Sequence, residues 1–151
     1  MKNSIHKILN KVDLNRISET IAEVERMTSA EVRVLLRERR STTEQQITIE
    51  ELAQKEFHSL GMAQTRDRNG VLILILYQER KVRIHVDLNA HSIIAPEEWQ
   101  RLVKAMTANF SERRFRDGII LAVREAGAIL AKHYPPKSDD TNELSNDVVV
   151  K

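Results

Sequence analysis

Apolar residues recur along this chain with two different spacings, and together they predict alternating helices and strands. Repeats of three and four residues, as in an amphipathic helix, occur in four stretches: 14–26, 49–60, 96–110 and 115–133. Alternation of apolar and polar residues, as in a half-buried strand, occurs in two stretches: 32–36 and 82–86. Residues 71–77 are apolar throughout and too few for a typical helix, so we expect a central strand that is covered on both faces.

Local signals mark the ends of several of these helices. Asp13 is expected to cap the first helix, and Thr48 with Glu51 three residues later forms a capping-box pattern for the second. Gly61 is a suitable end for the second helix, because glycine readily adopts the left-handed backbone conformation found there. Pro96 suits the first turn of the third helix.

The resulting order, α-β-α-β-β-α-α, predicts an α/β fold. The first two strands are joined through a helix and are therefore expected to be parallel. The third strand follows the second after a short turn, which predicts an antiparallel hairpin. A strand buried on both faces requires helices on both sides of the sheet. The sequence therefore predicts a three-layer α/β/α sandwich with a mixed, mainly parallel sheet that contains one antiparallel hairpin.

Length and composition indicate one globular domain with a basic body and an acidic end. The chain has 151 residues, a formal net charge of +2 and no cysteine, so disulfides, thiolate metal sites and cysteine nucleophiles are excluded. We expect an N-terminal extension at 1–12, one domain at 13–136 and an acidic, flexible tail at 137–151. Aromatic residues make up 4%, too few for base-stacking surfaces, and no nucleic-acid partner is expected.

The sequence contains no stretch that predicts a transmembrane helix. The longest segment without charge, 69–78, is much shorter than the ~20 apolar residues of a spanning helix. The first residues also lack the apolar core of a secretory signal, which predicts a cytoplasmic protein or a chain that begins after a removed signal. Lys2, Lys7 and Lys11 lie beside apolar residues, so peripheral contact with an anionic membrane is an alternative to a simple extension of the first helix.

A group of oxygen-bearing side chains is predicted to meet at one edge of the sheet. Asp67, Asn69 and Gly70 form an Asp-x-Asn-Gly turn directly before the central strand, a spacing typical of loops that bind calcium. Asp87 ends the antiparallel neighbour of this strand, and Glu31 begins its parallel neighbour. The pattern predicts a site for calcium or another divalent ion with these ligands: Asp67, Asn69, Asp87 and Glu31.

Two alternatives follow from the same residues. Asp67 can be an ordinary turn residue, with Arg66 and Arg68 as its ion-pair partners. A phosphatase would need a nucleophile or a metal-bound water, and here the metal would have to be held by Asp67 and Asp87. The five histidines are scattered, with none spaced three or four residues from another, so each is expected to be a surface or packing residue.

Several segments are similar, in unbroken order, to one known family. They are Ser-Ala-Glu-Val at 29–32, Asp-Arg-Asn-Gly-Val-Leu-Ile at 67–73, Arg-Lys-Val at 80–82 and His-Tyr-Pro at 133–135. With these segments the chain resembles the TPM domain, named after plant thylakoid-lumen, photosystem II repair and acetylcholine-receptor modulator proteins. The resemblance covers about residues 14–147 and implies an α/β/α sandwich, in agreement with the hydrophobic pattern.

The resemblance also implies a range of functions. Plant members have been assigned phosphatase activity and roles in photosystem repair, some members bind calcium in an acidic pocket, and many bacterial members have no established reaction. This chain differs from the family at 88–91 and 111–114, where glycine is common in other members. We expect an accessory protein that binds another protein, with calcium at the Asp67 and Asp87 edge. The alternative is a weak, metal-dependent phosphomonoesterase of the acid-phosphatase kind.

Overall fold

A computed structural model describes residues 4–137 and 145–151 of the chain. The α-helices are α1 (Lys11–Glu25), α2 (Ile49–Ser59), α3 (Leu88–Ile93), α4 (Pro96–Ser111) and α5 (Phe115–His133). The strands are β1 (Val32–Arg37), β2 (Val71–Leu76), β3 (Lys81–Val86) and β4 (Val149–Val150). Three short 3₁₀ helices complete the described elements: η1 (Ser4–Lys7), η2 (Thr42–Glu44) and η3 (Met62–Gln64).

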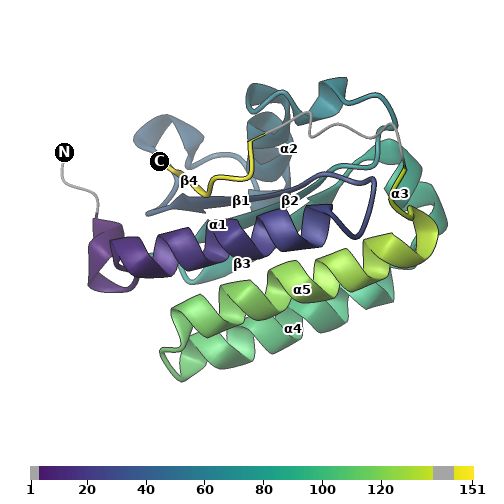
Figure 1. Cartoon of the computed structure of the whole chain (residues 1–151). Helices are drawn as coiled ribbons and strands as arrows, with labels where there is room; N and C mark the ends of the chain where they lie inside the picture. The colour runs from purple at the N-terminus through teal and green to yellow at the C-terminus, as the bar shows by residue number, and fades with distance from the viewer. Residues whose placement is uncertain (1–3, 138–144) are drawn as a thin grey trace.

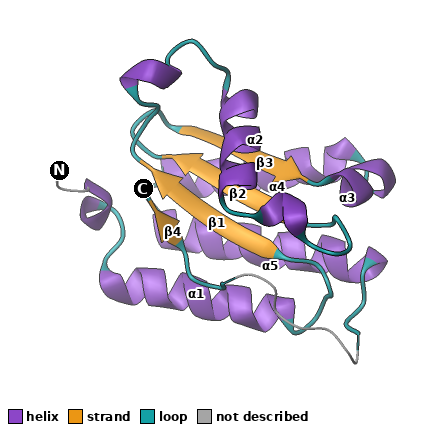
Figure 2. Ribbon diagram, turned by 90° about the horizontal axis from the view of Figure 1, so that it is seen from above, coloured by secondary structure: helices purple, strands orange, loops and turns teal. Residues whose placement is uncertain are grey.

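The elements form three layers, as the sequence predicts. Figures 1 and 2 show α1, α4 and α5 on one face of the sheet and α2 on the other. The strand order is β3-β2-β1-β4, with β2 parallel to β1 and antiparallel to β3. Every residue of β2 is buried, which confirms the prediction of a central strand covered on both faces.

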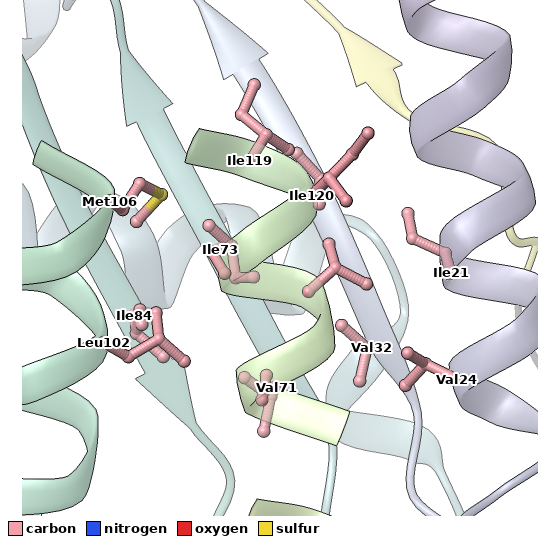
Figure 3. Packing of buried hydrophobic residues seen from close by; sticks show 14 of the residues in the cluster. Ile21, Val24, Val32, Val71, Ile73, Ile84, Leu102, Met106, Ile119 and Ile120 are labelled. Atoms are coloured by element: carbon pink, nitrogen blue, oxygen red, sulfur yellow. The ribbon is translucent and has the colours of Figure 1, made fainter. Parts of the chain in front are cut away.

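The alternation of side chains along β1 and β2 divides the apolar core into two parts. On one face, residues such as Val32 and Ile73 pack against α1, α4 and α5, and Figure 3 shows this packing from close by. On the other face, Leu72 and Leu74 pack against α2 and η3. Because side chains of a strand alternate between faces, a strand must be apolar at every position to line both parts of the core.

Helices α1 and α5 approach one another closely at Gly127. A methyl group built on this glycine would lie 2.4 Å from a methyl carbon of Val24, a distance that no side chain tolerates without movement. The small residue therefore allows α5 to pack tightly against α1 over the sheet. Figure 3 places Val24 beside the same cluster as Val32.

The first helix begins earlier than its sequence pattern predicts. Asn10, not Asp13, is the N-cap, and its side chain accepts a hydrogen bond from the backbone N–H of Asp13 at 2.8 Å. The Oδ2 atom of Asp13 in turn accepts a hydrogen bond from the backbone N–H of Asn10 at 3.0 Å, so the two residues form a capping box. Ile5 and Leu9, within the segment predicted as an N-terminal extension, are buried in the core.

Residues Val149–Val150 form a strand of the sheet that the hydrophobic pattern does not predict. Val149 and Val150 lie parallel to Leu35 and Leu36 of β1, and the backbone N–H of Lys151 donates to the carbonyl of Leu36 at 2.9 Å. Residues 138–144 lie outside the described part of the chain, so the flexibility predicted for them stays a prediction. Among the described helices, none combines the length and the apolar composition that crossing a membrane requires.

Candidate functional site

One end of the sheet brings together the backbone of the residues predicted to bind a cation. β1 and β2 begin at this end, and β3 finishes there. The N–H of Val71 donates to the carbonyl of Glu31 at 2.8 Å, and the N–H of Asp87 donates to the carbonyl of Gly70 at 3.0 Å. The strand connections predicted from the sequence therefore place these segments side by side, although their side chains take different partners.

The Asp87 carboxylate is held by Arg68. The guanidinium donates from Nε to Oδ2 at 2.9 Å and from Nη2 to Oδ1 at 3.1 Å, a two-point contact that is among the stronger ion pairs in proteins. Oδ1 also accepts a hydrogen bond from the N–H of Leu88 at 2.8 Å, which caps α3. Asp87 is only 3% exposed, and its hydrogen bonds raise the pKa of Arg68 above its ordinary value.

Asp67 lies beside a different set of cations. Its Oδ2 accepts from Nζ of Lys137 at 3.1 Å, and Nε of Arg66 lies 3.7 Å from its Oδ1. The Asp67 side chain is 29% exposed, so both pairs are partly screened by water. The turn that carries Asp67 is also joined to α3, because the N–H of Asn89 donates to the carbonyl of Arg68 at 3.0 Å.

Glu31 lies next to Glu25, a residue that the sequence analysis does not single out. Glu25 ends α1, and its Oε2 accepts a hydrogen bond from the N–H of Val32 at 2.7 Å. Burial, together with the neighbouring Glu31 carboxylate, raises the pKa of Glu25 to about 9. At neutral pH Glu25 therefore retains its proton. Glu25 and Glu31 are six residues apart, at the two ends of the turn between α1 and β1. No sequence motif with this spacing predicts that the two carboxyl groups meet.

Three of the four predicted ligands have other partners in this structure, and the fourth, Asn69, is buried with its side-chain Nδ2 unpaired among the described residues. The carboxylates of Asp67 and Asp87 are each occupied by a cationic side chain, and Glu31 lies against a second carboxyl. Within residues 4–137 and 145–151, no three side chains of histidine, aspartate or glutamate form a group that could hold a metal ion. Calcium remains a prediction from the sequence and the family resemblance.

A groove continues from this end of the sheet along the outer side of β3. It encloses about 660 Å³ and is lined by β3 itself and by residues of α2, α3 and α4. Phe57 of α2 contributes an apolar wall, and its ring centroid lies 4.6 Å from that of His85 on β3. Trp99 of α4 lines the opposite side, and its indole N–H is buried without a hydrogen-bond partner among the described residues.

The backbone of β3 faces this groove. The bond from Asp87 to Gly70 continues the β2–β3 ladder one residue beyond the Val71–Val86 pair. Because such bonds alternate along an antiparallel strand, the N–H and C=O groups of Val82, Ile84 and Val86 point away from β2. β3 is the edge of the sheet, and no described strand pairs with this outer side.

The family of this chain is identified by its sequence, and the fold agrees with the identification. The sequence model that describes the TPM domain matches residues 4–129. The chain belongs to the TPM-domain family. The resemblance noted in the sequence is thereby confirmed, together with the α/β/α sandwich that it implies.

Solved structures of similar proteins agree with this TPM-domain assignment. The NMR structure of BA42 from the psychrophilic bacterium Bizionia argentinensis has 29% sequence identity and a TM-score of 0.87, covering 98% of this chain and 99% of that one. The N-terminal domain of a protein from P. gingivalis has 13% identity and a TM-score of 0.69, covering 84% of this chain and 79% of that one. The N-terminal domain of protein cg2496 from Corynebacterium glutamicum has 14% identity and a TM-score of 0.59, covering 80% and 72%.

These likenesses establish the fold of this TPM domain and leave its activity open. The second and third structures share too little sequence to indicate more than the arrangement of elements. No functionally curated protein matches the chain significantly.

The ion pair between Arg68 and Asp87 yields a direct test of the calcium prediction. A calcium ion that uses the Asp87 carboxylate must displace the guanidinium, so we expect Arg68→Gln to bind calcium more tightly than the wild type. The measurement is a calcium titration by NMR, read at the amides of residues 66–70 and 87–90. Arg101→Gln, on the exposed side of α4, is the matched control. Equal titrations of wild type and Arg68→Gln would show that Asp87 is not a calcium ligand.

Proposed function

We propose that this TPM domain is a binding protein that receives an extended segment of a partner protein as an added strand on β3. The observation that supports the proposal is the outward-facing backbone of Val82, Ile84 and Val86 within a groove. Such an edge can bind a peptide through main-chain hydrogen bonds, while pockets on either side select its side chains. Helices α2 and α4 provide those two sides.

The charges of β3 favour an acidic segment over a second copy of the same chain. Lys81, Arg83 and His85 are its polar residues, and none is acidic. Antiparallel pairing of two copies of β3 would bring like charges together, and basic residues on an edge strand are a common protection against such pairing. An acidic partner would instead gain cross-strand pairs. Arg83 has one described ion-pair partner, Glu50 at 3.5 Å, in an exposed and therefore weak contact.

The groove also offers a buried donor. Trp99 is only 8% exposed, and its Nε1–H makes no hydrogen bond to the described residues. A buried donor without an acceptor is costly, and a carbonyl or carboxylate oxygen of a bound segment would satisfy it. Burial lowers the pKa of His85, which lies against Phe57 on the other side of the groove, and favours the neutral ring there.

A synthetic peptide tests the proposal. We expect a capped peptide that alternates glutamate and valine to bind, and to protect the amides of Val82, Ile84 and Val86 from hydrogen exchange. Val86→Pro removes one outward N–H without removing a bond of the β2–β3 ladder, and should weaken binding by about tenfold. Val86→Ala keeps the N–H and is the matched control.

Two results would contradict strand addition. One is equal binding of the peptide to Val86→Pro and to Val86→Ala. The other is a peptide that binds without protecting the amides of Val82, Ile84 and Val86 from hydrogen exchange. Equal binding of a peptide in which lysine replaces glutamate would contradict the preference for an acidic segment, because the charges of β3 would then play no part. The phosphatase alternative has no observation here that favours it over binding, and it stays a prediction from the sequence.

A further inference from the structure

A second cavity lies at the other end of the sheet, away from Asp87. It encloses about 540 Å³ between η1, the turn from β2 to β3 and the turn from α4 to α5. Cavities of this size are typical of small-molecule sites. Its wall is apolar and includes Ile8, Phe110, Phe115 and Ile119, with the rings of Phe110 and Phe115 5.6 Å apart.

Four cationic side chains surround this apolar wall. Lys7 comes from η1, Arg80 and Lys81 from the β2–β3 turn and the start of β3, and Arg113 from the α4–α5 turn. All four are exposed, and no aspartate or glutamate lines the cavity. None of the four forms an ion pair with a carboxylate in the described part of the chain.

The nearest acidic residues are already engaged elsewhere. Glu79, next to Arg80 in the chain, forms an ion pair with Arg40 at 2.7 Å. Glu38 accepts a hydrogen bond from the backbone N–H of Ser4 at 2.9 Å and lies 3.8 Å from Arg39. Besides the Ser4 N–H, Lys7 also lowers the pKa of Glu38, and besides Arg40, Lys81 also lowers the pKa of Glu79, so each of these two lysines has a carboxylate in its surroundings. Arg80 and Arg113 form no ion pair within the described residues, and the four cations together form a positive rim around the cavity.

Two of these cations occupy strained backbone positions. Arg80 has φ of 57° and Arg113 has φ of 63°, in the left-handed region where glycine is favoured. For an L-residue this conformation costs roughly 1–2 kcal/mol. Strain of this kind often accompanies function, because it persists only where the side chain or the backbone geometry is needed. Arg80 closes the β2–β3 turn, and Arg113 lies in the turn that ends α4, where its N–H donates to the carbonyl of Phe110 at 3.0 Å. Arg68, outside this cavity, has a similar φ of 52°. The turns of Arg80 and Arg113 carry their guanidinium groups to the mouth of the cavity.

We propose that this cavity binds a small amphipathic anion, with its anionic head on the cations and its apolar body against Phe110 and Phe115. The chemical class is a single-chain carboxylate or phosphate ester with a hydrocarbon tail. Arginine and lysine bind such head groups through charge-assisted hydrogen bonds. The apolar body of the ligand leaves water and covers a wall that is otherwise only half-buried, so binding buries apolar surface of both the ligand and the protein. This site is separate from the β3 groove and does not depend on the proposed function.

Sodium decanoate is the probe for the first experiment. We expect it to bind with shifts of the amides of residues 80–82 and 110–115, measured by NMR titration. Acetate, which lacks the tail, and decanol, which lacks the charge, should each bind about tenfold more weakly or not at all. Equal binding of decanol and decanoate would overturn the role of the cations. Equal binding of acetate and decanoate would overturn the role of the apolar wall.

Glycine substitutions test the arginines without straining the fold. Arg80→Gly with Arg113→Gly removes two charges at positions where glycine fits the backbone, so the variant should be at least as stable as the wild type. It should lose decanoate binding by about tenfold or more. Arg124→Gln, an exposed residue of α5 outside the cavity, is the matched control and should bind as the wild type does. Unchanged binding in the double variant would overturn the proposal.

Vesicles distinguish the two sources of such a ligand. Vesicles of phosphatidylcholine with phosphatidylglycerol present an anionic phosphate ester on a membrane surface, attached to two chains instead of one. If the protein sediments with these vesicles, if decanoate abolishes this sedimentation and if the double glycine variant does not sediment, then a lipid head group is the source. Decanoate binding without sedimentation would identify a free amphiphile. Both results support the site, and neither is expected if decanoate fails to bind.

Discussion

Leu74→Asp is expected to cost the domain about 4 kcal/mol or more of its free energy of unfolding. Leu74 lies in the middle of β2, is 0% exposed, and faces α2 in the second part of the core. An aspartate there would either place an unpaired charge in an apolar environment or take up a proton at a free-energy cost. Because domains of this size are stable by only about 5–15 kcal/mol, a large part of the population would unfold.

Urea unfolding followed by circular dichroism measures the effect. Leu74→Ile, which keeps the volume and the apolar character, is the matched control and should cost less than about 1.5 kcal/mol. Leu74→Asn separates charge from polarity, since it adds hydrogen-bonding groups without adding an ionisable one. If Leu74→Asp is as stable as Leu74→Ile, then β2 is not the buried centre of the sheet.

Arg37→Met is the second substitution with a large expected effect. Arg37, at the end of β1, bridges Glu44 of η2 at 2.6 Å and Glu56 of α2 at 3.3 Å, and all three side chains are largely buried. Without the guanidinium, the two buried carboxylates lose their main cationic partner. Removing one partner of a buried ion pair lowers the free energy of unfolding by roughly 3–5 kcal/mol. Lys55 still contacts Glu44 and Lys151 still contacts Glu56, so we expect the lower end, about 3 kcal/mol.

The effect of Arg37→Met should depend on pH. The hydrogen bond from Arg37 lowers the pKa of Glu44 well below its ordinary value of 4.5 in the folded protein. A lowered pKa in the folded state contributes stability above the ordinary value, and this contribution is lost as the pH falls below it. The difference in unfolding free energy between wild type and Arg37→Met should therefore be larger at pH 7 than at pH 3.

Urea titrations of both proteins at the two pH values provide the measurement. Lys55→Met is the control, because this lysine is 61% exposed and its pair with Glu44 should contribute less than about 1 kcal/mol. A difference that is the same at pH 3 and pH 7 would show that Arg37 contributes through packing and not through the charge of Glu44.

The helices and strands with strong local patterns could be predicted from the sequence. The unbroken apolar run of β2 indicated its burial on both faces, and Thr48 with Glu51 marked the start of α2. Gly61 follows α2 with φ of 75°, as its position predicts. These features depend on residues close in sequence, so the pattern alone contains the necessary information. Asp13, predicted as the N-cap of the first helix, is the N3 residue of its capping box, and Asn10, three residues earlier, is the N-cap.

The candidate site could be predicted only in part. The connections between strands place Glu31, Gly70 and Asp87 at one end of the sheet, and their backbone hydrogen bonds agree. The choice of side-chain partners could not be predicted in the same way. Asp87 is held by Arg68 from the turn before β2, and Glu31 lies against Glu25. Which charge reaches which carboxylate depends on distances of a few ångströms that spacing in the sequence does not specify.

The family, the three-layer sandwich and the burial of β2 could all be predicted from the sequence alone, because hydrophobic periodicity and short motifs depend on residues that are close together in the chain. The tertiary structure alone decided the pairing of β4 with β1, the open backbone of β3 and the positive rim of the second cavity. Each of these joins segments that are distant in the chain. Lys7, Lys81 and Arg113 line one cavity only because the packing of helices on the sheet brings η1, the start of β3 and the α4–α5 turn together.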